Sequence, residues 1–205
     1  MPRSIPSSSG IKLYSYPTFQ TTLDAELEQD LAQIPEGQNK ADGVTVGQKV
    51  AVQILAFRGT DGANVTLPPY VPGNYQFTPP NFIPADFIQW PQITPFALAR
   101  ADEFRPWPPP QLTSEEYTRT FDEVKSLGFI TSKTRTREQT LIGNFWNGSI
   151  QDFWNEIAQT AALGHHLGLA RSAPLFPLPN IGLADTMIAF FEAKHTYQFW
   201  RPVTG

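Results

Sequence analysis

Residues 191–202 read Phe-Glu-Ala-Lys-His-Thr-Tyr-Gln-Phe-Trp-Arg-Pro, and this aromatic and basic run is the most informative part of the chain. If it is helical, Lys194 and Arg201 are separated by two turns less about 20°, with roughly 10 Å of rise between them. Both long side chains then leave the same face. Lysine offers a compact ammonium group and arginine a planar fork that matches paired oxygens. The spacing therefore predicts a small oxyanion-binding face, with the helix ending at Pro202.

A solvated surface is the usual place for a lysine and an arginine, but the neighbours of these two favour partial burial. The residues at three and four positions from Lys194 and Arg201 carry no carboxylate, and Asp185 and Glu192 are expected on roughly the opposite side. Cations buried among aromatic side chains require a counter-charge. The counter-charge is either a carboxylate from a distant part of the chain or a bound anion, and the sequence leaves both open.

Outward from this run, apolar spacing predicts an all-α fold, a helical bundle that is incomplete and has long proline-rich ordered loops. Thr113 and Glu116 fit a capping box, and Gly128 fits the position just after a helix. Prolines at 174, 177 and 179 should form an ordered loop or an extended connection. Helices are expected near residues 23–34, 44–57, 113–128, 136–146, 150–165 and 181–200, with a proline-rich wrap over 68–110.

Composition narrows the classes of protein. The 205 residues carry a net charge of −4 and no cysteine, and the basic residues form no run, so we expect no nucleic-acid partner. No window reaches the roughly 18 consecutive apolar residues of a membrane span, and the first ten residues lack the apolar core of a secretory signal. The compartment stays open.

The pattern Lys-x6-Arg-Pro, filled by Lys194, Arg201 and Pro202, resembles the first signature segment of a known superfamily. This superfamily comprises the vanadium-dependent haloperoxidases and the type-2 phosphatidic acid phosphatases. The resemblance covers roughly residues 41–204. Supporting matches lie at 72–76, 104–110, 123–125, 138–140, 145–146 and 191–204.

The resemblance implies that Lys194 and Arg201 bind oxygens of vanadate, or of phosphate in the phosphatases. It also implies two later segments, Pro-Ser-Gly-His and Ser-Arg-x3-Gly-x-His, and neither occurs in the 205 residues. His165, His166 and His195 lack that context; we expect structural or surface roles for the first two and a packing role for His195. No complete catalytic set and no metal site is therefore expected in this chain.

Three hypotheses follow. The chain is a fragment of a haloperoxidase-like enzyme that oxidises halide with hydrogen peroxide, an acid phosphatase of the same superfamily, or an inactive structural or interaction module. In the first hypothesis, residues 1–40 form a leader and short helix, and 41–205 form the N-terminal part of the helical domain. The missing C-terminal half would leave apolar surface exposed, which makes a homodimer possible.

Overall fold

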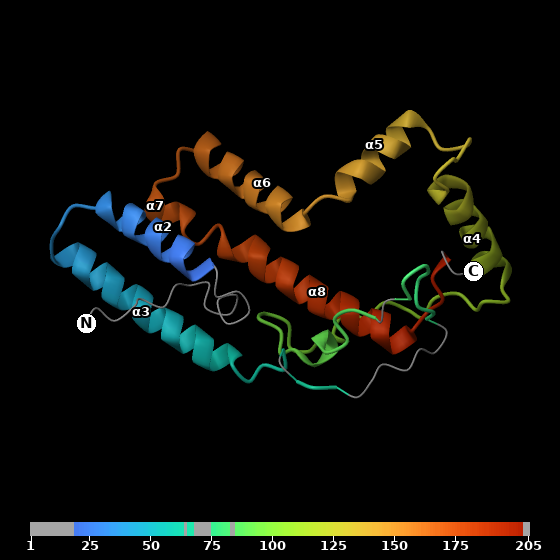
Figure 1. Cartoon of the computed structure of the whole chain (residues 1–205), viewed down its shortest axis with the longest axis horizontal. Helices are drawn as coiled ribbons and strands as arrows, with labels where there is room; N and C mark the ends of the chain where they lie inside the picture. Colours follow the sequence, from blue (N-terminus) through green and yellow to red (C-terminus); the bar gives the residue numbers. More distant parts are fainter. Residues whose placement is uncertain (1–18, 64, 68–74, 83–84, 203–205) are drawn as a thin grey trace. The chain divides into compact units, whose positions relative to one another are not determined.

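The computed structural model describes residues 19–63, 65–67, 75–82 and 85–202, and the described part is helical without strands (Figure 1). This confirms the predicted all-α class. The chain divides into two compact units, Met1–Asp61 and Gly62–Gly205. The expected boundary between a leader (1–40) and the helical domain (41–205) stays a prediction. Residues 1–18 of that leader lie outside the described residues. The elements are α2 (Gln20–Ala32), α3 (Gln38–Arg58), η2 (Trp90–Gln92), α4 (Glu115–Gly128), α5 (Arg137–Trp146), α6 (Ile150–Gly164), α7 (Leu169–Ser172) and α8 (Pro177–Tyr197).

The first unit contains α2 and α3, which a short turn at residues 33–37 connects. Both helices were expected, the first from its cap and stop signals and the second from apolar spacing. Between them lies an open, largely apolar cavity of about 1200 Å³. At the end of α3, the guanidinium of Arg58 pairs with the Asp61 carboxylate at 2.8 Å, and the Arg58 side chain is buried while that of Asp61 is half-buried.

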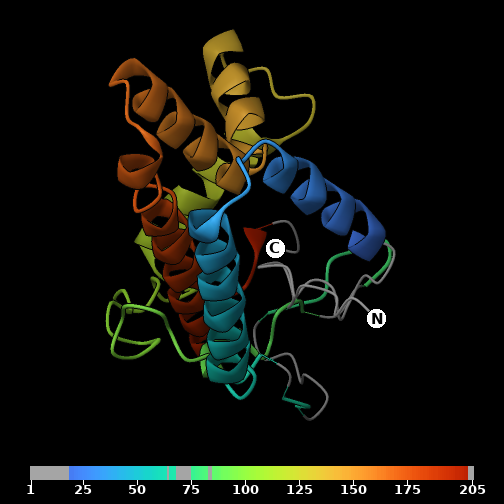
Figure 2. The same ribbon diagram turned by 90° about the vertical axis from the view of Figure 1, so that its left-hand side faces the viewer.

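The second unit is built around α8, which contacts α6 and the short helix η2. Ile188 and Phe191 of α8 are only 2% and 5% exposed, and Ala158 and Ala162 of α6 are buried as well. The turn through α7 leads the chain from α6 into α8 (Figure 2). Small alanine side chains on α6 fit a close approach of the two helices, and the core of this unit therefore lies along the middle of α8.

The expectation of a loop through Pro179 and of a helix that begins at residue 181 was wrong, because α8 already begins at Pro177. Pro177 occupies one of the first positions of α8, and Pro179 follows within the first turn. The first turn of a helix has no intrahelical partners for its N–H groups, so proline is tolerated there and its fixed φ favours the helical conformation. The prolines start α8 rather than break it.

Two helix ends also differ from expectation. Ser114, and not Thr113, begins α4: its hydroxyl accepts a hydrogen bond from the Tyr117 N–H at 3.1 Å. The capping box with Glu116 is therefore wrong. Gly128 is the last residue of α4, and Phe129 in an extended conformation ends the helix. Neighbouring hydroxyl residues are equally eligible as caps, so the pattern alone did not place the start of this helix.

The helix α5 and the outer face of α6 expose large apolar side chains. Trp146 is 61% exposed and Ile157 is 55% exposed. An exposed apolar surface of this kind is uncommon on a chain that acts alone. The exposed set on these two helices comprises Leu141, Ile142, Phe145, Trp146, Ile150, Trp154, Ile157 and Leu163.

Candidate functional site

The end of α8 separates the two predicted site residues. Lys194 lies in the last turn, the helix ends at Tyr197, and Arg201 follows beyond it. The prediction of one helix running to Trp200 was wrong. Gln198 adopts the left-handed conformation (φ 44°, ψ 43°), and its N–H donates to the Lys194 carbonyl at 3.0 Å. A left-handed residue commonly closes a helix in this way, so Lys194 and Arg201 are not related by helical spacing.

The two cations nevertheless meet at one aromatic ring. Lys194 Nζ lies 5.8 Å from the ring centroid of Tyr75, and Arg201 Cζ lies 5.8 Å from the same centroid. The cationic centres are therefore no farther apart than twice that distance. Arg201 Nη1 also donates to Tyr75 Oη at 3.3 Å and to Thr78 Oγ1 at 2.8 Å. Tyr75 is 7% exposed, which makes it one of the few buried aromatic residues.

Lys194 is surrounded by aromatic rings, as its neighbours in the sequence predicted. Its Nζ lies 5.1 Å from the Phe191 centroid and 5.9 Å from the Phe190 centroid, and the side chain is half-buried. Within the part of the chain that the structure describes, no carboxylate lies at ion-pairing distance from this ammonium group. A distant carboxylate was one of the two counter-charges considered for Lys194, and the described residues provide none within ion-pairing distance.

The two acids of α8 face a later part of the proline-rich wrap, residues 96–105. Asp185 is 4% exposed, and its carboxylate accepts hydrogen bonds from the backbone N–H groups of Phe96, Ala97 and Leu98 at 2.6, 2.7 and 2.9 Å. Seven residues later, Glu192 is buried as well and also faces this segment. Residues seven apart share a helix face, so both acids hold the proline-rich segment on the side of α8 that they share.

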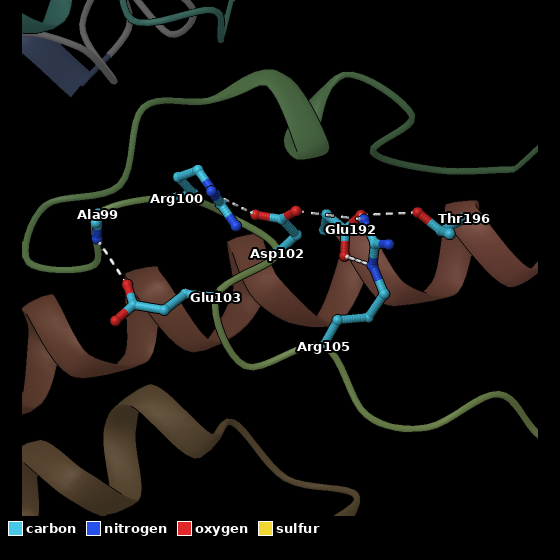
Figure 3. A network of polar contacts seen from close by, with 7 residues as sticks. All are labelled: Ala99, Arg100, Asp102, Glu103, Arg105, Glu192 and Thr196. Carbon is cyan, nitrogen blue, oxygen red and sulfur yellow. Dashed lines mark hydrogen bonds and ion pairs between the residues drawn. The ribbon is translucent and has the colours of Figure 1, made fainter.

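Glu192 belongs to an ionic network (Figure 3). Its carboxylate accepts from the Arg105 guanidinium through two hydrogen bonds, one of 2.8 Å from Nε, and from Thr196 Oγ1 at 2.7 Å. The Asp102 carboxylate lies 3.8 Å from Arg105 Nη2, measured from Oδ2, and 2.8 Å from Arg100 Nε, measured from Oδ1. The hydrogen bond from Arg105 lowers the pKa of Glu192, and the hydrogen bond from Arg100 lowers the pKa of Asp102. The acidic charge of this network is therefore matched by arginines.

Arg105, Asp102 and Tyr75 were not singled out from the sequence. The one signal for the network was the placement of Asp185 and Glu192 away from Lys194, which left two buried acids in need of partners. Tyr75 precedes Lys194 by 119 positions, and no periodic pattern connects residues so distant in the sequence.

The histidines take no part in the cation pair. His195 Nε2 lies 3.2 Å from the Asp86 carbonyl oxygen, and its ring stacks on Phe191 with centroids 5.8 Å apart. Burial lowers the pKa of His195 and so disfavours the charged imidazolium. His165 ends α6, and His166 is left-handed; both are exposed. These positions agree with packing and surface roles.

The donor set at Tyr75 fits an anion. An ammonium group and a guanidinium group provide only N–H donors, which suit the oxygens of a tetrahedral oxyanion such as vanadate or phosphate. A metal cation would require a different set, and the described residues contain no group of three histidine or acidic side chains that could hold one. The site residues present therefore fit the charge-neutralising part of an oxyanion site.

Comparison with solved structures shows a likeness to a vanadium-dependent enzyme. The chain is similar to a protein described as the first bacterial vanadium-dependent iodoperoxidase, with 26% sequence identity and a TM-score of 0.75. The match covers 89% of this chain and 49% of the other, so the chain spans about half the length of that protein. No family model matches the sequence, and no curated protein matches it. The likeness supports the haloperoxidase superfamily. None of the described helices is long and apolar enough to cross a membrane.

Proposed function

We propose that this chain contributes the first oxyanion-binding segment of a vanadium-dependent haloperoxidase-like enzyme, in which Lys194 and Arg201 bind oxygens of vanadate. The observation that supports this most is the approach of both cations to the ring of Tyr75. The likeness to an iodoperoxidase is the second support.

The two side chains have complementary tasks in this proposal. The Lys194 ammonium is a compact charge on a side chain that is half-buried among aromatic rings, and the Arg201 guanidinium offers a planar set of donors. Together they neutralise negative charge on the oxyanion by preorganised electrostatics, which costs little reorganisation when the ligand arrives. Bound vanadate would supply the activation of hydrogen peroxide that halide oxidation requires.

Turnover belongs to the whole enzyme in this proposal. The 205 residues contain no Ser-Arg-x3-Gly-x-His segment, and His195, the histidine nearest in sequence to the cations, contacts Asp86 instead. We therefore expect no halide oxidation by the purified 205-residue chain with vanadate, bromide or iodide, and hydrogen peroxide. Multiple turnovers in that assay would contradict the proposed division of roles.

Acid phosphatase activity of the whole protein is the alternative, because the same cation pair fits phosphate. Positive charge placed beside a transferring phosphoryl group stabilises the charge spread over its oxygens. A chain that binds phosphate much more tightly than orthovanadate would favour this alternative. An inactive interaction module would bind neither anion at Lys194 and Arg201.

Calorimetric titration of the chain with orthovanadate and with phosphate tests the proposal. Lys194→Ala and Arg201→Ala should each weaken binding about tenfold or more, because a hydrogen bond to a charged group contributes about 1.5–3 kcal/mol. Lys125→Ala is the matched control: this exposed lysine lies in the last turn of α4, with its Nζ 5.8 Å from the Phe121 ring centroid. Equal affinities in wild type and both site variants would reject the assignment.

A further inference from the structure

We infer that Tyr75 is a positioning residue for the oxyanion site: its ring attracts the Lys194 ammonium group by a cation–π interaction, and its hydroxyl accepts a hydrogen bond from Arg201. This inference rests on the proposed function. It assigns a role to the described part of the proline-rich segment.

One side chain, Tyr75, contacts a cation on α8 and a cation on the segment that follows it. Lys194 Nζ lies 5.8 Å from the Tyr75 centroid, inside the roughly 6 Å within which a cation is attracted to the face of a ring. Arg201 Cζ lies at the same distance from the centroid but toward the hydroxyl edge, where Nη1 donates to Oη at 3.3 Å. Lys194 is fixed by the helix and Arg201 by the turn after it, so Tyr75 is the element common to both. Thr78, three residues along the same segment, accepts a second bond from Arg201 Nη1 at 2.8 Å.

A ring differs from a carboxylate in what it leaves available. A carboxylate between two cations would position them but would also cancel one of the two positive charges. The quadrupole of an aromatic ring attracts cations while the ring itself stays neutral. A tyrosine partner can therefore hold the ammonium group of Lys194 in place and leave its charge to attract an anion.

Positioning also affects affinity through entropy and repulsion. Lysine and arginine lose much rotamer freedom when they are fixed, and a bound anion must order them unless they are ordered beforehand. Two like charges also repel each other before the anion arrives. The buried ring of Tyr75 reduces both costs, because its own side chain is held at 7% exposure. Removing its attraction should weaken anion binding although the ring need not touch the anion.

Stepwise fluorination of the ring separates this role from simple packing. Phenylalanine, and phenylalanines with one, two and three ring fluorines, are introduced at position 75 by nonsense-codon suppression in the full chain. Fluorination weakens the quadrupole with little change in size, so a packing role predicts no trend. We measure orthovanadate and phosphate binding by calorimetry, and folding by circular dichroism and thermal unfolding.

The expected results are graded. Tyr75→Phe should weaken binding about threefold, because it keeps the ring and removes the hydroxyl that accepts from Arg201. Each added fluorine should lower the affinity further, to about tenfold below Tyr75→Phe with three fluorines. The same series at Phe121, whose centroid lies 5.8 Å from Lys125 Nζ, is the control and should leave anion binding unchanged.

Failure of this inference and failure of the proposed function give different results. If Lys194→Ala and Arg201→Ala weaken binding but the fluorinated series at position 75 shows no trend, the role of Tyr75 is overturned and the oxyanion site stands. If the wild-type chain binds neither anion, both are overturned. A trend that disappears in the Lys194→Ala background supports the coupling of the ring to that cation.

Discussion

Replacing Asp185 by asparagine should release the proline-rich segment from α8. In the structure the Asp185 carboxylate is 4% exposed and accepts three short backbone hydrogen bonds, from the N–H groups of Phe96, Ala97 and Leu98. An asparagine of the same shape keeps one acceptor oxygen, and its amide group turns donors toward N–H groups that are themselves donors. The change therefore removes the match between the side chain and the segment.

The magnitude follows from these three bonds. Hydrogen bonds to a charged group contribute about 1.5–3 kcal/mol each, but a loop that detaches recovers part of this by bonding to water. We therefore expect Asp185→Asn to lower the free energy of unfolding by about 3 kcal/mol. For a chain of this size, that corresponds to a fall in Tm of roughly 10 °C.

Hydrogen exchange is the assay that localises the effect. In the wild type the amide protons of residues 96–98 should exchange slowly, and in Asp185→Asn they should exchange at rates close to those of an unstructured loop. Asp122→Asn on the exposed face of α4 is the control and should change stability by less than about 0.5 kcal/mol. If amides 96–98 stay protected in Asp185→Asn and the Tm is unchanged, the anchoring role of this carboxylate is refuted.

Two further predictions concern stability. Because Arg105 lowers the pKa of Glu192, the pair should stabilise the fold above the ordinary pKa of 4.5 and lose this contribution as the pH falls through the lowered value; Glu192→Gln should remove that part of the pH dependence of Tm. Gly62→Ala should lower the free energy of unfolding by about 2 kcal/mol or more, because φ is +99° and a Cβ would lie 2.3 Å from the Gln92 carbonyl oxygen. Gly143→Ala inside α5 should instead raise it by about 0.5–1 kcal/mol, because a Cβ there meets no atom within 4 Å. Urea unfolding measures both changes.

Local patterns predicted the helices well and their ends less well. Apolar spacing and stop signals located six helices because apolar residues recur at helical spacing along an amphipathic helix and proline or glycine marks its end. The ends depend on single residues. Gln198 is neither glycine nor asparagine, so its left-handed conformation had no signal in the sequence, and Pro202 was the first visible stop. The capping box of α5, in which the Thr136 and Gln139 side chains accept from each other's backbone N–H, was missed although Thr-x-x-Gln is a sequence signature of a helix start.

The role of Lys194 and Arg201 as oxyanion ligands stays a prediction. The two residues were identified from their residue types and neighbours, and the structure brings both near Tyr75, but by a route other than helical spacing. Tyr75 belongs to a segment whose fold is set by tertiary contacts. Likewise, the pairing of Arg105 with Glu192 joins residues 87 apart, and a single sequence carries no record of such pairs.

The left-handed turn at Gln198 makes the gap between the two cations adjustable. Had one helix carried both, its pitch would dictate their separation, and any change would require rebuilding the whole cylinder. With three residues between Tyr197 and Arg201, substitutions there can shift the guanidinium, together with its contacts to Tyr75 and Thr78, while the ammonium keeps its place on α8. A small group of substitutions at 198–200 could thus retune the chain toward oxyanions of different diameter.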